Sequence, residues 1–391
     1  MAPPEARPIR FPLPIRVLHL TRWLHPVGGG IRTYLAQAAA ALDPAVVEFQ
    51  AAALEAGVAP AYLPRVRYLG RPGDSRPVAM LRFWGWLRHA LAEVDVVHIH
   101  GVFNPLLPSG ALACRRRGVP YVVSPHGALE PWGLNQRRAA KQLFLGVGGR
   151  RLLRRSSAVL ASTPANAEAI RSTDPRLPVR VVLPGVAVAD RPTVDFLREE
   201  FSSTLRILYL GRFEPVKGID VLLDALRRLR ADGSEAQLDV VGWGDAAYTA
   251  RLKAGVLEHG LEGHVVFHGF LDGAEKLRRL RAAHVLAVPS HSENFSFAAA
   301  EALAVGLPVV ATANVALAPW LRRYDCGTVV PVADPAALAG ALARYRDPAL
   351  RRAQAGHAHA CAGRELSQEV MGRGLQDVYR DAVRLRAATA G

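Results

Sequence analysis

The chain has 391 residues, half of them hydrophobic, and carries a formal net charge of +15 at pH 7. This length predicts two domains rather than one core, and the hydrophobic content excludes a mainly disordered protein. Three cysteines, Cys114, Cys326 and Cys361, fit neither a disulfide framework nor a metal spacing, so we expect a cytoplasmic protein. The proline-broken amino-terminal segment lacks the apolar run of a signal peptide, and no uninterrupted apolar stretch is long enough to span a bilayer.

Short apolar runs alternate with longer amphipathic ones in the first half of the chain, a pattern typical of parallel α/β units. After the first strand, Gly29 and Gly30 belong to a loop that would let the backbone approach a phosphate at the start of the next helix. A tight strand-to-helix turn would require the same glycines, so this loop alone decides nothing. The predicted strands of this half cover residues 15–20, 46–52, 94–100, 120–126, 158–162 and 179–183, and helical patterns include residues 31–42, 77–92 and 135–155.

Three histidines of this half lie on neighbouring predicted strands. His98 and His100 project to the same side of one strand, and His126 ends the next. Three imidazoles could hold a metal ion, but no carboxylate or further histidine has a suitable spacing, so we predict no metal site. From its position alone, a histidine at the end of a strand is a structural hydrogen-bonding group.

Arginines cluster in the first half, at residues 115–117, 137–138, 150–151 and 154–155. A codon bias toward arginine would explain part of this enrichment without any function. A functional explanation requires an anionic partner, which could be a membrane surface, a phosphate-bearing acceptor or nucleic acid. No nucleic-acid-binding motif accompanies the charge and aromatic residues are not interleaved with it, so we expect no nucleic-acid partner.

The periodicity fades over residues 184–203, as expected of a linker, and a second series of strands follows. Two such series predict two doubly wound domains with ligand-binding turns at the carboxyl ends of their strands. One turn contains Gly242 and fits a loose dinucleotide fingerprint, but the next strand does not end in the acidic residue that a dinucleotide site needs. The strands of this half are predicted within residues 205–213, 238–244, 264–270, 284–290, 307–312 and 327–332, and a last helix covers residues 367–388.

Two cations share the loop after the first strand of the second series. Arg212 and Lys217 lie at the carboxyl end of that strand, just before a helix. Paired cations in this position suit a departing diphosphate, whose charge must be neutralised. A solvated surface pair is the alternative for a motif of this kind taken alone.

Two glutamates flank the start of a short helix later in the same half. Glu293 precedes the helix, Ser296 opens it, Glu301 lies on it, and Gly306 ends it. Backbone N–H groups at the start of a helix bind anions. Carboxylates on both sides of an anion site suit a ligand with hydroxyls at both ends and phosphates between them, as in a nucleotide sugar.

Together these motifs resemble those of the retaining GT-B glycosyltransferases of family 4. The matching strings are GR-x4-KG at residues 211–218, Glu-x7-Glu at Glu293 and Glu301, and SPHGALEPW around His126. The last string is similar to sugar transferases that build bacterial exopolysaccharides and O-antigens. The resemblance implies a GT-B fold with two Rossmann-like doubly wound domains facing a central cleft. Its parts would be an acceptor-side domain at residues 1–190, a nucleotide-sugar-binding domain at residues 191–366, and a terminal helix at residues 367–391 that crosses back to the first domain.

The resemblance also implies roles for individual residues. His126 and Glu293 would contact the transferred sugar, Arg212 and Lys217 would stabilise the leaving diphosphate, and Glu301 would bind the ribose. The expected catalytic residues are His126, Arg212, Lys217 and Glu293. The further donor-binding residues would be Gly29, Gly30, Gly242, Phe270, Leu271, Asn294, Phe295, Ser296 and Phe297, and the acceptor side would hold Arg32, Glu130 and Trp132.

The implied enzyme moves a sugar with retention from a nucleoside-diphosphate sugar to a glycan or polyprenyl-diphosphate-linked acceptor, in bacterial surface polysaccharide biosynthesis. It needs neither a metal nor a cofactor, and its basic first half would dock on the inner face of the plasma membrane. The sequence departs from the family in reading ENFS where many members have EGFG, and in placing the bulky Trp243 in a Gly-rich turn. Two alternatives stay open: a GT-B nucleotide-sugar epimerase that hydrolyses its substrate, and a non-catalytic nucleotide-sugar-binding scaffold.

Overall fold

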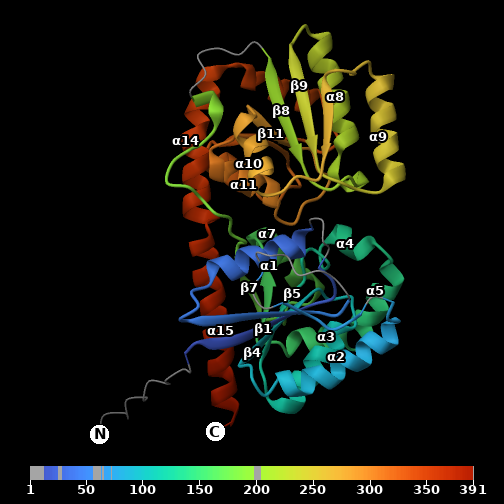
Figure 1. The fold of residues 1–391 in the computed structure, drawn as a ribbon, viewed down its shortest axis with the longest axis vertical. Helices are drawn as coiled ribbons and strands as arrows, with labels where there is room; N and C mark the ends of the chain where they lie inside the picture. Colours follow the sequence, from blue (N-terminus) through green and yellow to red (C-terminus); the bar gives the residue numbers. More distant parts are fainter. Residues whose placement is uncertain are drawn as a thin grey trace. The chain divides into compact units, whose positions relative to one another are not determined.

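The structure is a computed structural model that describes residues 13–24, 29–55, 63, 66–71, 73–197 and 204–390 (Figure 1). The chain divides into two compact units. Unit 1 comprises residues 1–183 and 371–391, and unit 2 comprises residues 184–370. Each unit is built around its own parallel sheet.

Unit 1 contains a seven-stranded sheet in the order β3-β2-β1-β4-β5-β6-β7, and all of its neighbouring strands pair in parallel. The central strands are buried along nearly their whole length, as expected of a parallel sheet covered on both faces. The sequence does not predict β3 (Val66–Tyr68), an edge strand of three residues that is too short for a periodic signal. The strands are β1 (Ile15–Thr21), β2 (Val47–Ala53), β3 (Val66–Tyr68), β4 (Val96–His100), β5 (Tyr121–Ser124), β6 (Ala158–Ala161) and β7 (Val179–Val181).

Helices lie on both faces of this sheet (Figure 1). The predicted helix over residues 135–155 was wrong as one element, because Gly148 interrupts it with a φ of 172° and divides it into short helices. Thr163 caps α7 (Pro164–Thr173), since its hydroxyl accepts a hydrogen bond from the Asn166 N–H at 3.2 Å. The helices are α1 (Gly30–Ala41), α2 (Arg76–Ala90), α3 (Leu106–Arg117), α4 (Pro131–Asn135), α5 (Arg138–Phe144), α6 (Arg150–Arg154), α7 (Pro164–Thr173) and α15 (Gln368–Ala390).

The carboxyl-terminal helix α15 is part of the core of unit 1. Tyr379 is fully buried, and its hydroxyl lies 2.9 Å from Nδ1 of His98 on β4. Gly372 lies so close to α1 that an added Cβ would come within 2.1 Å of the Ala41 carbonyl oxygen. The last segment of the chain therefore completes the unit that the first segment begins.

Unit 2 contains a six-stranded parallel sheet in the order β10-β9-β8-β11-β12-β13. Together with unit 1 it confirms the prediction of two Rossmann-like doubly wound folds. No helix of the described residues is both long and apolar enough to cross a membrane. The strands are β8 (Leu205–Leu210), β9 (Ala236–Val241), β10 (Val265–Gly269), β11 (Val285–Val288), β12 (Val309–Thr312) and β13 (Gly327–Val330), and the helices are α8 (Ile219–Ala231), α9 (Ala246–Glu258), α10 (Gly273–Ala282), α11 (Phe297–Val305), α12 (Ala318–Arg323), α13 (Pro335–Ala343) and α14 (Pro348–Glu365).

Candidate active site

The loop that follows β8 brings Lys217 to Glu293. Their side chains form an ion pair, and both are mostly shielded from solvent, with side-chain exposures of 17% and 16%. Gly218 allows this loop to pass under the end of β11, because it has a φ of +64° and an added Cβ would lie 2.3 Å from the Pro289 carbonyl oxygen. The cation expected at the diphosphate and the carboxylate expected at the sugar are thus in direct contact.

Backbone contacts fix the position of Glu293. Its N–H donates to the carbonyl of Asn314 at 3.2 Å, and its carbonyl accepts from the N–H of Ala316 at 3.0 Å. The hydroxyl of Ser290 lies 3.4 Å from Oε2 of the Glu293 side chain. This glutamate is therefore held between the ends of β11 and β12, which is the edge of a parallel sheet where ligands bind.

The second glutamate of the motif is paired in the same way. Glu301 lies on α11, as predicted, and its carboxylate accepts from Nζ of Lys276 on α10 at 2.8 Å. The sequence analysis missed Lys276, because nothing in the spacing of α10 relates it to α11. Each of the two predicted ligand-binding carboxylates therefore has a lysine beside it.

The start of α11 is strained at the capping residue that precedes the helix. Ser296 caps the helix with its hydroxyl, which accepts from the Ala299 N–H at 3.3 Å. Its φ is +74°, a region that residues other than glycine seldom adopt, and such strain is concentrated at functional sites. Phe295 is buried and Phe297 packs against it edge to face, while Asn294 is half-buried. The predicted anion-binding turn is thus held in one conformation by its capping serine and two aromatic rings.

Arg212, the other predicted cation, is more exposed than Lys217 and forms an ion pair with Glu214 on its own loop. Its backbone carbonyl accepts from the hydroxyl of Tyr209 at 2.8 Å. The nearby turn at Gly242 leaves no room for a side chain, since an added Cβ would lie 1.8 Å from the Gly211 carbonyl oxygen. The N–H of Gly242 also donates to the Gly269 carbonyl at 2.8 Å, so this turn links the ends of β8, β9 and β10.

Phe270 and Leu271, expected among the donor-binding residues, directly follow β10. Phe270 is exposed and Leu271 is half-buried, which leaves an apolar surface at this end of the sheet. The predicted donor residues of unit 2 thus lie on loops that follow β8, β9, β10 and β11 or on α11, which begins at the same carboxyl edge of the sheet.

The predicted residues of unit 1 lie at the start of α1, at the start of α4 and after the end of β5. Gly29 is the residue before α1, with a φ of +115°, and Gly30 is its first residue, while Arg32 is buried in the first turn. The preceding glycine of the predicted loop, at position 28, lies outside the described residues. Glu130 accepts a hydrogen bond from the Asn166 side chain at 2.6 Å, and Trp132 on α4 is exposed.

His126 follows β5 in a left-handed conformation, with a φ of +50°. Its Nε2 lies 2.8 Å from Nδ1 of His100, and its ring stands 4.9 Å from that of Tyr34 in an edge-to-face contact. Burial lowers the pKa of His126 to about 4. The imidazole is therefore neutral at pH 7, with one N–H to donate and one nitrogen to accept.

The histidines behind His126 form a cluster that includes a residue missed by the sequence analysis, His19 on β1. Ring nitrogens of His19, His98 and His100 all lie within 4.8 Å of one another, and the three side chains are buried. Burial holds their pKa values well below the ordinary range, with a further contribution from the neighbouring histidines. These nitrogens could ligate a metal ion, but they also hydrogen-bond to each other and to hydroxyls. The absence of a metal requirement stays a prediction.

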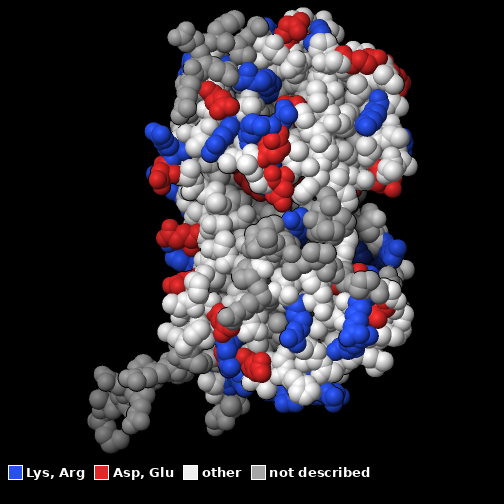
Figure 2. All heavy atoms as spheres, viewed as in Figure 1, with Lys and Arg blue, Asp and Glu red and all other residues white. Residues whose placement is uncertain are grey.

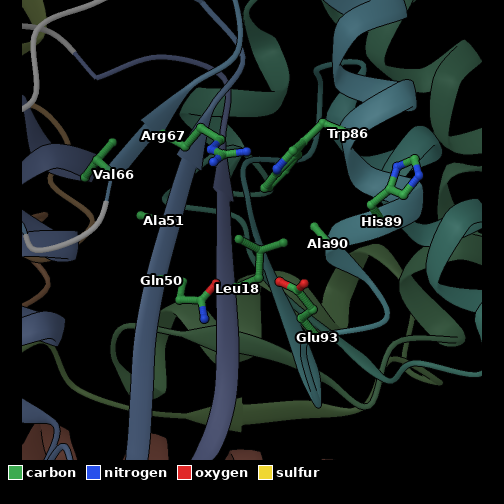
Figure 3. Close-up of a pocket in the computed structure, with 9 residues that line it drawn as sticks. All are labelled: Leu18, Gln50, Ala51, Val66, Arg67, Trp86, His89, Ala90 and Glu93. Carbon is green, nitrogen blue, oxygen red and sulfur yellow. The ribbon is translucent and has the colours of Figure 1, made fainter.

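A separate pocket of about 550 Å³ lies in unit 1, beside β1, β2, β3 and α2 (Figure 3). Trp86 forms one wall, and the guanidinium of Arg67 lies 6.0 Å from its ring centre. None of the residues predicted for the active site lines it. The lining residues are Leu18, Gln50, Ala51, Val66, Arg67, Trp86, His89, Ala90 and Glu93.

Solved structures with the same fold belong to GT-B glycosyltransferases. The structure superposes on HepE from Anabaena in complex with UDP and glucose with a TM-score of 0.75 and 19% identity, covering 94% of this chain and 99% of that one. It superposes on sucrose-phosphate synthase from Thermosynechococcus elongatus with a TM-score of 0.77 and 22% identity, covering 96% and 100%. At these identities the likeness establishes the fold.

Sequence comparisons establish the family. The family model described as "Glycosyl transferases group 1" matches residues 192–357, and that of the "Glycosyl transferase 4-like domain" matches residues 29–185. A D-inositol 3-phosphate glycosyltransferase from Acidothermus cellulolyticus is 31% identical over 350 residues, which are 82% of this chain and 75% of the relative. One from Xylanimonas cellulosilytica is 29% identical and covers 96% of this chain and 92% of its own. A phosphatidyl-myo-inositol mannosyltransferase from Mycobacterium leprae is 40% identical over 148 residues, 37% of this chain and 38% of its own. The chain therefore belongs to the glycosyl transferases group 1 family, with a glycosyl transferase 4-like domain in its first half, and is a glycosyltransferase.

Proposed function

We propose that the protein transfers a sugar, with retention and without a metal ion, from a nucleoside-diphosphate sugar to a hydroxyl of a phosphate-bearing acceptor. The observation that supports this most is the pairing of the two motif glutamates with lysines, Glu293 with Lys217 and Glu301 with Lys276. A diphosphate competes for the lysines, and sugar hydroxyls donate to the carboxylates. The two ion pairs thus hold charged groups of the kinds that a nucleotide sugar would contact.

The reaction breaks the bond between the anomeric carbon and the diphosphate oxygen. Arg212, Lys217 and the first N–H groups of α11 stabilise the charge that develops on the leaving diphosphate. One diphosphate oxygen takes the proton of the acceptor hydroxyl, whose oxygen bonds to the anomeric carbon on the face that the diphosphate leaves. In this proposal Glu293 and His126 orient the transferred sugar, and Glu301 binds the ribose.

For the acceptor, the shared feature of two candidates is a phosphate near the reacting hydroxyl. The motifs around His126 favour a polyprenyl-diphosphate-linked glycan of bacterial surface polysaccharide biosynthesis. The relatives, by contrast, are named as glycosyltransferases of D-inositol 3-phosphate and of phosphatidyl-myo-inositol. The arginine-rich surface of unit 1 suits either one, because both are anionic.

The test begins with calorimetric binding of UDP, GDP, ADP and TDP, followed by turnover of the matching sugars with myo-inositol, D-myo-inositol 3-phosphate and a polyprenyl-diphosphate glycan. We expect transfer to a phosphorylated acceptor with the anomeric configuration retained, as read by NMR of the product. Lys217→Ala and Arg212→Ala should each lower kcat about a hundredfold. An inverted product, or equal use of the unphosphorylated polyol, would refute the proposal. Release of the sugar without an acceptor would favour the hydrolysing epimerase, and binding without consumption would favour the scaffold.

We also propose that unit 1 attaches to an anionic leaflet, where a lipid-linked acceptor would be presented. Lys and Arg side chains gather over the region of α2, α3 and α5 (Figures 1 and 2). Within the described part of the chain, seven exposed arginines on or next to α3, α5 and α6 have no acidic partner, and Leu143 on α5 and Val147 between α5 and α6 are 67% and 81% exposed. Exposed apolar side chains among cations suit a lipid headgroup region. The seven are Arg115, Arg116, Arg117, Arg137, Arg138, Arg151 and Arg155.

Co-sedimentation with vesicles tests this attachment. Each cation near an anionic surface contributes about 1 kcal/mol, so binding to vesicles with anionic lipid should exceed binding to neutral ones and fall as salt is added. Replacing Leu143 and Val147 with Ser should weaken binding without changing the charge. Equal recovery on neutral and anionic vesicles at low salt would show that the arginines reflect composition alone.

A further inference from the structure

One uninterrupted series of hydrogen bonds runs through the core of unit 1 and ends at His126. It joins side chains from β1, β4, β5 and α15, all of them buried except His126 itself. The successive contacts are Ser124 Oγ to His98 Nε2 at 2.8 Å, His98 Nδ1 to the Tyr379 hydroxyl at 2.9 Å, that hydroxyl to His19 Nε2 at 3.5 Å, His19 Nδ1 to His100 Nε2 at 3.0 Å, and His100 Nδ1 to His126 Nε2 at 2.8 Å.

The protons of this series must all point the same way. Each histidine is neutral, so it donates through one nitrogen and accepts through the other. The Tyr379 hydroxyl has one proton and must give it to His98 or to His19. If it accepted from both, that proton would be buried without a partner among the described residues. The tautomer of His126 is therefore tied to the direction of every bond behind it.

The far end of the series sets that direction. Ser124 lies at that end and is 3% exposed, and His98 is the one hydrogen-bond partner of its hydroxyl among the described residues. If the series pointed inward, His98 would donate to Ser124, and the hydroxyl proton of Ser124 would lack an acceptor among the described residues. If it points outward, Ser124 donates to His98, and every proton of the series as far as His126 has an acceptor. An unpaired buried donor is costly enough to favour the outward order about tenfold or more.

We propose that Tyr379 is a positioning residue for sugar transfer. It passes the proton order set by Ser124 on to His126, which then carries its proton on Nδ1. In the described part of the chain, Nδ1 of His126 has no hydrogen-bond partner of its own. His126 therefore presents an N–H donor and selects an oxygen with a lone pair on its ligand. This inference rests on the proposed function, in which that ligand is the transferred sugar.

The first readout needs no substrate. In full-length protein labelled with ¹⁵N-histidine, NMR identifies which nitrogen of His126 carries the proton, and His126→Gln assigns the signal. We expect Nδ1–H in the wild-type protein. In Tyr379→Phe the hydroxyl is lost, and the phenyl ring can accept the His19 N–H only weakly. Both directions then become available, so His126 should become a mixture of tautomers.

The second readout links the series to the reaction. Tyr379→Phe should lower kcat/KM for the nucleotide sugar about fivefold, the effect of weakening one directed hydrogen bond, while the affinity for the nucleoside diphosphate is unchanged. The matched control is Tyr345→Phe, which removes an equally buried hydroxyl in unit 2 that contacts Gln354 at 2.9 Å. It should leave the His126 signal unaltered.

The outcomes distinguish the proton order of the series from the role of His126 in sugar transfer. An unchanged His126 tautomer in Tyr379→Phe would overturn the relay, whatever the activity. A changed tautomer with unchanged kcat/KM would overturn the assignment of His126 to the sugar. The same NMR change in Tyr345→Phe would reduce Tyr379 to a general structural role and overturn the proposal.

Discussion

Mild acid should weaken unit 1 strongly, because three neutral histidines are buried in its core and a fourth, His126, lies half-buried beside them. The pKa of His126 is lowered to about 4, and those of His19, His98 and His100 are held well below the ordinary range. In the unfolded chain all four recover a pKa of about 6.5. Between these values the unfolded state binds more protons than the folded state, so stability falls as the pH is lowered through about 6.5.

The size of the effect follows from the same shifts. At pH 5.5, about one unit below the unfolded pKa, each histidine contributes a loss of more than about 1 kcal/mol. Four of them give about 5 kcal/mol relative to pH 7.5, which is comparable with the entire stability of many domains. The loss should continue to grow as the pH falls toward the folded pKa of His126, near 4.

Hydrogen exchange measured by mass spectrometry resolves this loss by unit. Peptides covering β1 and β4 should lose about 5 kcal/mol of protection between pH 7.5 and pH 5.5, after correction for the intrinsic exchange rates. His19→Gln, which keeps a hydrogen-bonding side chain but cannot titrate, should remove about a quarter of this dependence. If the protection of β1 and β4 changes by less than about 1 kcal/mol, the four histidines do not titrate as the burial of their rings requires.

Three further predictions concern unit 2. Glu301→Ala should weaken binding of the nucleoside diphosphate about tenfold. Glu293→Gln should preserve or tighten that binding, because it releases Lys217, but it should lower turnover. Calorimetry that shows the reverse order of diphosphate affinities would invert the two assignments. Activity should persist in excess chelator, because Arg212 and Lys217 supply the positive charge; loss of activity that a divalent ion restores would direct attention to His19, His98 and His100. Gly242→Ala should lower the free energy of unfolding by about 1–3 kcal/mol, because the added Cβ clashes with the Gly211 carbonyl. The control is Gly340→Ala, in a helix with open space around the added Cβ, which should be neutral or stabilising. Equal melting temperatures for the two variants would contradict this prediction.

The sequence predicted the sheets well because buried parallel strands are continuous apolar runs. It failed where local signals were weak or misleading. The edge strand β3 has three residues, and residues 135–155 have helical periodicity although Gly148 breaks them. Both failures lie outside the strand ends that carry the predicted ligand residues.

The candidate site was predicted as a set of loops, but its internal contacts were not. The motifs located Lys217, Glu293 and Glu301, since each follows or precedes a recognisable strand or helix. Lys276 and His19 were missed because their partners lie 25 and 81 residues away in the chain. Only the folded sheet and its packed helices bring such residues together. A periodic pattern in the sequence does not indicate which distant residues will be in contact.

The position of Tyr379 has a consequence for synthesis of the chain. Unit 2 is one continuous segment, so it can fold as soon as residue 370 has left the ribosome. Unit 1 is translated first but needs α15, and the contact between His98 and Tyr379 spans 281 residues. We expect the amino-terminal half of the nascent chain to stay incompletely folded, because its buried histidines lack the Tyr379 contact, while the later half folds. Removal of the last twenty residues should therefore destabilise the beginning of the protein more than its end.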